Sequence, residues 1–352
     1  MPPRDDAFIN ARPSFVIGGE ERADLQEAIT GMVINLPLTG CAHGELTLTN
    51  WGTPEGQQTP DFLFADIGLG SEVEIRMGDP QPATLFRGEV TAIEEQYGDG
   101  APTLALLLQD RLHHLARARQ NRSYEDQSPD DIVQAIASEA GLQADVQVSS
   151  IADTWHQLNE SDLAFLLRLL GRFDIALRLE GNTLRARPEQ PDPQPLALDA
   201  QDSALQVRLM VDLNHQPLSS TSQGYNLGTD AAVEHRSEAL SPAPAGTGAA
   251  DTLAQLGWPG EEVVPHPFPR SQGEADAYAG AHFHRQAKRF VQGELVCQGE
   301  PGLKSGREIE LSGVSPRLRG TYQVVHCSHR FDNQSGFETH LKVNKADWSP
   351  NP

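Results

Sequence analysis

Residues 128–141 read SPDDIVQAIASEAG, and this stretch decides the fold. Ser128 can cap a helix, Pro129 suits the first helical position, and two aspartates follow where the helix dipole is positive. Apolar residues then recur at helical spacing, and Gly141 supplies a stop. The sequence therefore predicts an amphipathic helix that packs its apolar face into a core.

The residues around this helix predict a small α/β unit over residues 119–195. A second helix is expected over 159–170, followed by a hairpin of two short strands over 174–179 and 183–186. The unit ends in the segment 188–195, where four prolines each fix φ and remove a backbone donor. This segment is predicted to be a stiff linker.

The residues before the unit, 1–118, are predicted to form a first β module. Several segments alternate apolar and polar residues, the period of a sheet with one solvated face. Clusters of turn residues separate them, which favours a barrel or a sandwich. The strand candidates are 28–36, 45–49, 72–77, 85–93 and 103–108.

Residues 196–352 are predicted to form a second β module that includes one helix, 274–290. The helix has acidic residues at its start and basic residues at its end, which matches the helix dipole. Residues 217–269 are rich in Ser, Gly, Ala and Pro and are predicted to be a long loop that is exposed or faces a partner. The strand candidates are 205–213, 293–298, 308–311, 321–326 and 337–343.

The formal net charge of -22 limits the kinds of partner that the protein is expected to bind. Such a field repels phosphate backbones, so no nucleic-acid partner is expected. The acidity fits either the solubility of a large surface or a negative pore or docking face for a basic partner. No apolar run reaches the roughly 18 residues needed to span a bilayer, and Met1–Asp6 lacks the features of a signal peptide. We expect assembly in the cytoplasm without membrane insertion.

No catalytic or cofactor motif is found in the sequence. It contains no nucleophile elbow, phosphate-binding loop, zinc-protease motif or dinucleotide fingerprint. The three cysteines lack paired spacing and are predicted to be small buried thiols rather than disulfides: Cys41, Cys297 and Cys327.

The twelve histidines form no clear metal site. His113 and His114, like His282 and His284, are expected to point to different faces of a helix. His326, His329 and His340 could converge if their strands pair, but no cysteine or carboxylate stands at ligand spacing. We therefore predict no metal, no cofactor and no catalytic residue.

Several stretches of the sequence resemble segments of a known protein family. The stretch 128–142 resembles the helix that follows the first barrel in phage late control gene D proteins. Residues 155–166, WHQLNESDLAFL, are similar to the Gln-x-x-Glu-Ser-Asp-x-x-Phe-Leu signature that this family shares with the hub region of valine-glycine repeat protein G of type VI secretion. Residues 299–311, 320–324 and 329–331 are similar to its Gly-x-Pro-x-Leu, Gly-x-Tyr-x-Val and His-x-Phe succession.

The resemblance implies a β-rich α+β chain with two β-barrel modules of tail-hub type and an inserted α/β unit. Three such chains would close a ring in the baseplate of a virion tail or contractile injection particle, with no reaction to catalyse. The implied partners are the chain itself as a homotrimer, a tail tube protein, baseplate wedge proteins and a trimeric spike. Because the sequence ends at Pro352, the spike is expected to be a separate protein.

Three residues are predicted to lie at interfaces: Trp348, Tyr322 and Trp258. Exposed tryptophans are enriched at binding hot spots, and Trp348 follows the last expected strand. The segment 217–269 fits the family poorly and is expected to touch a sheath, wedge or spike neighbour. Two alternatives remain: a tail-tip peptidoglycan hydrolase or peptidase, and a monomeric β-rich adhesin or carbohydrate binder. The aromatic content of 6% disfavours the adhesin or carbohydrate binder.

Overall fold

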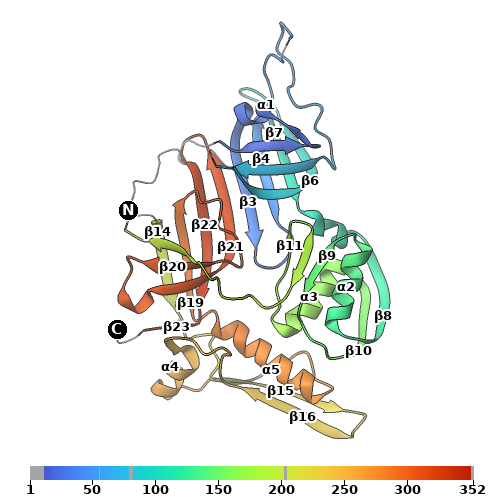
Figure 1. Cartoon of the computed structure of the whole chain (residues 1–352), viewed down its shortest axis with the longest axis vertical. Helices are drawn as coiled ribbons and strands as arrows, with labels where there is room; N and C mark the ends of the chain where they lie inside the picture. Colours follow the sequence, from blue (N-terminus) through green and yellow to red (C-terminus); the bar gives the residue numbers. More distant parts are fainter. Residues whose placement is uncertain (1–11, 55, 79–81, 202–203, 350–352) are drawn as a thin grey trace.

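The computed structural model describes residues 12–54, 56–78, 82–201 and 204–349. The predictions about the N-terminal residues and the end of the chain lie wholly or partly outside these ranges. The described chain is β-rich with a minority of helix, which confirms the predicted α+β class. Its first and last groups of strands share one large sheet, and a small α/β unit and a layer built on a hairpin lie beside this sheet (Figure 1).

The first group of strands follows the predicted alternation closely. In β5 the side chains of Val73, Ile75 and Met77 are buried, and the charged residues between them are not. Every predicted strand is present, and two short strands and a helix that the sequence did not indicate precede them. The elements are β1 (Ser14–Ile17), β2 (Glu20–Glu21), α1 (Ala23–Ala28), β3 (Ile29–Pro37), β4 (His43–Thr49), β5 (Glu72–Met77), β6 (Ala83–Gln96) and β7 (Thr103–Gln109).

The α/β unit contains both predicted helices. Ser128 accepts a hydrogen bond from the Asp131 amide, and the Asp131 carboxylate accepts one from the Ser128 amide, which together form a capping box. The second helix begins later than predicted because residues up to Ser161 pair as a strand with β8. The elements are η2 (Arg111–Ala116), β8 (Arg119–Gln127), α2 (Pro129–Glu139), β9 (Gln143–Val146), β10 (Asp153–Ser161), α3 (Asp162–Leu170), η3 (Gly171–Phe173), β11 (Leu177–Glu180) and β12 (Thr183–Ala186).

The last group of strands also matches the predicted segments. The cysteines in it, Cys297 and Cys327, are buried, whereas Cys41 in the first group is only half-buried. The elements are β13 (Leu196–Asp199), β14 (Ala204–Val211), β19 (Val291–Gln298), β20 (Glu308–Ser312), η4 (Pro316–Leu318), β21 (Gly320–Asp332), β22 (Gly336–Lys345) and β23 (Asp347–Trp348).

Strand β21 joins the first and last groups into one sheet. It pairs with β3, so that the described residues form a continuous sheet of 13 strands. Two separate apolar cores lie along this sheet, and Leu36 of β3 packs against both. A third core fills the α/β unit. Closure of each half of the sheet into its own barrel stays a prediction.

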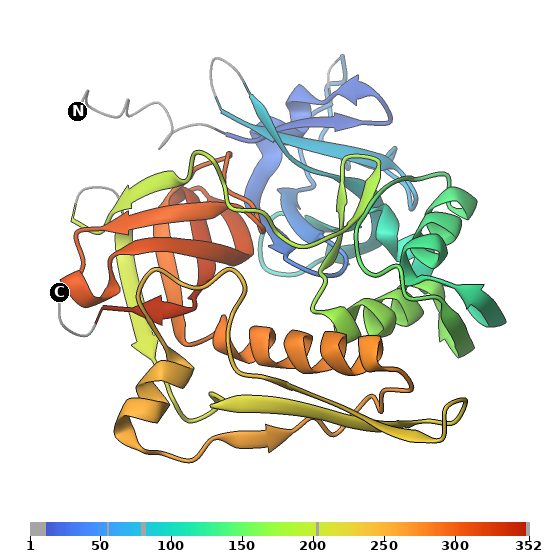
Figure 2. The same ribbon diagram turned by 60° about the horizontal axis from the view of Figure 1, so that its bottom comes forward.

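The prediction of a long loop over 217–269 is wrong. The segment folds into β15 (Ser219–Asn226), β16 (Ala231–Ser237), β17 (Thr247–Gly248), α4 (Ala249–Leu256) and β18 (Glu261–Val263). The helix α5 (Gln272–Ala287), predicted over 274–290, lies along the β15–β16 hairpin (Figure 2). We call residues 219–287 the hairpin layer.

The strands of the hairpin layer could not be predicted from the sequence because the buried side chains of β15 are polar. β15 buries Ser219, Ser220 and Ser222 where a sheet ordinarily buries apolar side chains. At Gly224 a Cβ would lie 2.0 Å from the Pro269 carbonyl oxygen, so the close approach of these two segments requires glycine. The serines and glycine that suggested a loop are therefore what allows close packing.

Candidate functional site

The three predicted interface residues occupy different environments. Trp258 follows α4 and is 54% exposed, as an interface residue must be. Trp348 is half-buried, with its ring 6.2 Å from that of Phe290. Its indole nitrogen is buried without a hydrogen-bond partner among the described residues. The roles of Trp258 and Trp348 at interfaces stay predictions.

The structure contradicts the assignment of Tyr322 to an interface. Its side chain is fully buried in the core of the last strand group, and its hydroxyl donates a hydrogen bond of 2.7 Å to the Leu318 carbonyl. Burial raises the pKa of this hydroxyl. Because β21 alternates inward and outward, its Tyr322 ring takes an inward position. Tyr322 is therefore part of the core.

Exposed apolar side chains recur along the segment of the hairpin layer that contains Trp258. Five large apolar residues of this layer are at least half exposed in the described chain. One is Leu227, and the other four lie between residues 256 and 268: Leu256, Trp258, Val263 and Phe268. We call these four residues the hairpin patch. Large exposed apolar groups of this kind mark interaction surfaces when they gather in one place.

A second exposed group, which the sequence did not single out, lies at the far end of the first strand group. The ring centroids of Trp51 and Phe62 are 5.2 Å apart, and those of Phe62 and Tyr97 are 6.1 Å apart, both edge-to-face. All three rings are at least 40% exposed. The β4–β5 loop that carries two of them projects from the end opposite the hairpin layer (Figure 1). We call these three residues the aromatic tip.

Ser220, Glu262 and His282 lie together but in the wrong order for a catalytic triad. The Ser220 hydroxyl donates a hydrogen bond of 2.8 Å to Glu262 Oε1, and His282 Nε2 is 2.9 Å from the same oxygen. In a triad the histidine stands between the nucleophile and the carboxylate and removes the proton. Here both groups contact the carboxylate, and Ser220 is fully buried. The arrangement does not activate Ser220.

Cys327 and His329 form a second pair that resembles catalytic groups. Cys327 Sγ and His329 Nε2 are 3.5 Å apart in the centre of the sheet. Burial raises the pKa of the Cys327 thiol and lowers the pKa of His329 to about 4. Both groups are therefore neutral at pH 7, whereas a cysteine nucleophile requires the thiolate. Cys327 and His329 are therefore buried residues of the sheet and do not form a catalytic pair.

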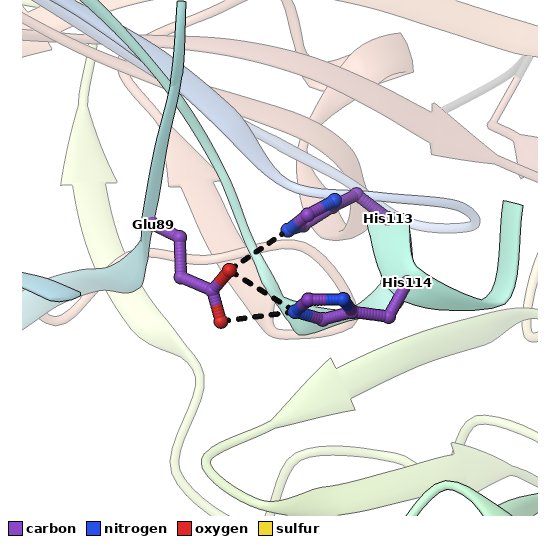
Figure 3. A group of neighbouring side chains, drawn as sticks. All are labelled: Glu89, His113 and His114. Carbon is purple, nitrogen blue, oxygen red and sulfur yellow. Dashed lines mark hydrogen bonds and ion pairs between the residues drawn. The ribbon is translucent and has the colours of Figure 1, made fainter. Parts of the chain in front are cut away.

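His113 and His114 both contact Glu89 (Figure 3). His113 Nε2 is 3.2 Å from Glu89 Oε2, and His114 Nε2 is 3.0 Å from each carboxylate oxygen. Burial would raise the pKa of Glu89, but the bonds from His114 and His113 outweigh it and hold that pKa below its usual value. The expectation that these histidines point to different faces is wrong, because the short 3-10 turn stacks the rings 4.1 Å apart.

A family model, described as the Alg8 N-terminal domain, matches residues 65–333, well over half of the chain. The chain belongs to the Alg8 N-terminal domain family. No curated protein matches its sequence. Membership of the phage late control gene D family, which the motifs resemble, stays a prediction.

Solved structures share the fold of this Alg8 N-terminal domain family member. The prophage MuSo2 43 kDa tail protein from Shewanella oneidensis superposes with a TM-score of 0.72 at 12% identity, over 96% of this chain and 99% of that one. The tail protein from Neisseria meningitidis MC58 gives 0.71 at 11% identity, over 97% and 99%. The E. coli c3393 protein, a component of the type VI secretion system, gives 0.61 at 13%, over 90% and 73%. At these identities the likeness is one of fold.

Proposed function

We propose that the protein is a structural, non-enzymatic hub of a contractile tail or injection system. The observation that carries the proposal is the match of fold along 99% of the length of each of two tail proteins. The relative from E. coli is described as structurally similar to the T4 bacteriophage tail proteins gp27 and gp5. A chain that keeps this architecture from end to end is suited to the same kind of assembly.

We place the hub in a ring of three copies that joins the tail tube to a central spike. The hairpin patch and the aromatic tip support this placement. Their side chains are exposed, and the elements that carry them lie at opposite ends of the molecule (Figure 1). A subunit of a closed ring needs distinct surfaces for its neighbours and for the proteins above and below it. We assign the hairpin patch to contacts between copies and the aromatic tip to an axial partner.

The proposed partners are the spike, the tail tube protein and the baseplate wedge proteins, in a virion tail or injection particle. The net charge of -22 favours basic surfaces on at least one of them. Among the described residues no helix is long and apolar enough to cross a membrane.

Light scattering on the purified chain, alone and with its candidate spike, tests the proposal. We expect a trimer, or a monomer that forms a 3:3 assembly with the spike. Trp258→Ser should weaken the association between copies by at least about 2 kcal/mol, the loss typical of a hot-spot tryptophan. Leu158→Ser is the matched control, because Leu158 is 68% exposed but lies on the α/β unit. A wild-type chain that stays monomeric with both spike and tube proteins contradicts the hub.

A further inference from the structure

We propose that Glu89, His113 and His114 bind one divalent metal ion of the zinc class and leave a fourth coordination position open. Two imidazoles and one carboxylate are a ligand set that zinc accepts in proteins. Their nitrogen and oxygen atoms all lie within 4.8 Å of one another. The proposal adds a ligand to the chain and does not depend on its role in a tail.

The distances within the cluster fit a tetrahedral ion. Zinc bonds of about 2.0–2.1 Å place neighbouring ligand atoms about 3.3 Å apart. The contact of Glu89 with His113 is 3.2 Å and its contacts with His114 are 3.0 Å. Two of the three ligand pairs therefore already stand close to the spacing that an ion needs, and the two histidine nitrogens lie within 4.8 Å of each other.

Two rigid elements hold the ligands in place. The histidines lie on η2, which Asp110 fixes by accepting hydrogen bonds from the amides of Leu112 (2.9 Å) and Ala42 (2.8 Å). Glu89 lies on β6 directly after Gly88, where a Cβ would come within 2.2 Å of the Gln109 carbonyl oxygen. Only glycine permits this close approach of β6 to the end of β7. The backbone thus positions the ligands before any ion arrives, which lowers the cost of binding.

The cluster is buried on one side and open on the other. The His113 side chain is 6% exposed and that of Glu89 is 17% exposed, whereas that of His114 is 49% exposed. His114 also lines a cavity of about 340 Å³ together with Glu139, Asp162 and Arg111. An ion held by three protein atoms beside such a cavity can take a water molecule or an external ligand as its fourth.

Arg117 opposes metal binding in a way that can be tested. Its Nε donates a hydrogen bond of 3.4 Å to His113 Nδ1. When Nε2 of a neutral imidazole binds an ion, Nδ1 carries the proton and needs an acceptor rather than a donor. Arg117 is exposed and is able to turn away, but at a cost to the affinity. Arg117→Gln supplies an amide oxygen that can accept this proton and should tighten zinc binding several-fold.

Bound zinc would connect β6 of the first strand group to η2, whose Leu112 and Leu115 belong to the core of the α/β unit. A ligand that binds only the folded chain stabilises it by mass action. Zinc should therefore raise the melting temperature of the chain, and the gain should depend on all three ligands.

Calorimetric titration of the chelator-treated full chain with zinc chloride tests the site, with thermal unfolding as a second readout. We expect one zinc per chain and a loss of affinity of at least about tenfold in Glu89→Gln and in His114→Ala. His114 is half exposed, so the second variant keeps the fold even where His113→Ala does not. His340→Ala is the matched control, since His340 Nε2 lies 3.0 Å from a single carboxylate, that of Glu338. This variant should bind zinc as the wild type does.

Two results would overturn the site. One is a wild-type chain that takes up no zinc at millimolar concentration. The other is zinc binding that survives in His114→Ala, which would show dispersed binding by the acidic surface. Equal affinity of Arg117→Gln and the wild type would overturn the assignment of His113 Nε2 as a ligand.

Discussion

The buried imidazole of His329 should make the stability of the chain depend on pH. His329 lies on β21 opposite Ile34 of β3, at the seam that joins the first and last strand groups. Its Nε2 is 3.0 Å from the Leu303 carbonyl oxygen, which can only accept, so this nitrogen carries the proton. Nδ1 is then left to accept from the Thr339 hydroxyl at 3.1 Å. Both contacts suit the neutral ring.

The magnitude follows from the shift in pKa. Burial lowers the pKa of His329 from 6.5 to about 4, and each unit corresponds to about 1.4 kcal/mol. Because the folded-state pKa lies below the unfolded one, the unfolded chain binds the proton first as the pH falls. The contribution of about 3 kcal/mol is therefore complete above pH 6.5 and is lost between pH 6.5 and about pH 4.

Urea unfolding at a series of pH values, followed by tryptophan fluorescence, measures this contribution. Between about pH 7 and pH 4 the unfolding free energy of the wild type should fall by about 3 kcal/mol more than that of His329→Gln. Carboxylates titrate in both proteins and cancel in the difference.

Thr339→Val is the control for destabilisation alone. It removes a buried hydroxyl and should cost about 1–3 kcal/mol, yet it should keep the steep pH dependence because the imidazole remains. If His329→Gln retained the wild-type dependence on pH, the stated cause would be wrong.

Three further outcomes are expected. Ser128→Ala removes the capping box with Asp131 and should lower the unfolding free energy by about 1 kcal/mol in urea titrations. Gly299→Ala would place a Cβ 1.8 Å from the Phe337 ring and should lower stability by about 1–3 kcal/mol or prevent folding, as judged by melting temperature. Gly280→Ala, on α5 with nothing within 4 Å of the added Cβ, should instead raise the melting temperature.

The predictions that succeeded rest on local chemistry. The helix α2 could be placed within a residue because Ser128, Pro129 and Asp131 act on the backbone beside them. Most strands of the large sheet could be placed because apolar and polar residues alternate along them, as in β5. Neither signal requires knowledge of distant contacts.

The predictions that failed depend on tertiary contacts. The inner face of β15 is made of serines that α5 covers, so its pattern carries no hydrophobic period. Glu89 meets His113 and His114 only because β6 and β7 pair and the chain then turns into η2. A separation of about 25 residues gives no sign of such a meeting. Tyr322 could not be told from an exposed tyrosine until the inward face of β21 was known.

The motifs behind the family resemblance specify structure. In the Gln-x-x-Glu-Ser-Asp signature, buried Gln157 donates to the Glu160 carbonyl at 3.0 Å and to the Asp162 carboxylate at 2.8 Å. Ser161 caps α3, and Glu160 forms an ion pair with Arg168 at 2.7 Å. These bonds turn the chain from β10 into α3.

A motif that builds a turn is compatible with many different neighbours. The resemblance therefore supports the architecture. It does not specify the partner, which depends on the exposed surfaces. On those surfaces, substitutions in the hairpin patch or the aromatic tip cost little folding energy and can change what the chain binds. Partner specificity should for that reason follow these two surfaces, whereas the motifs should follow the fold.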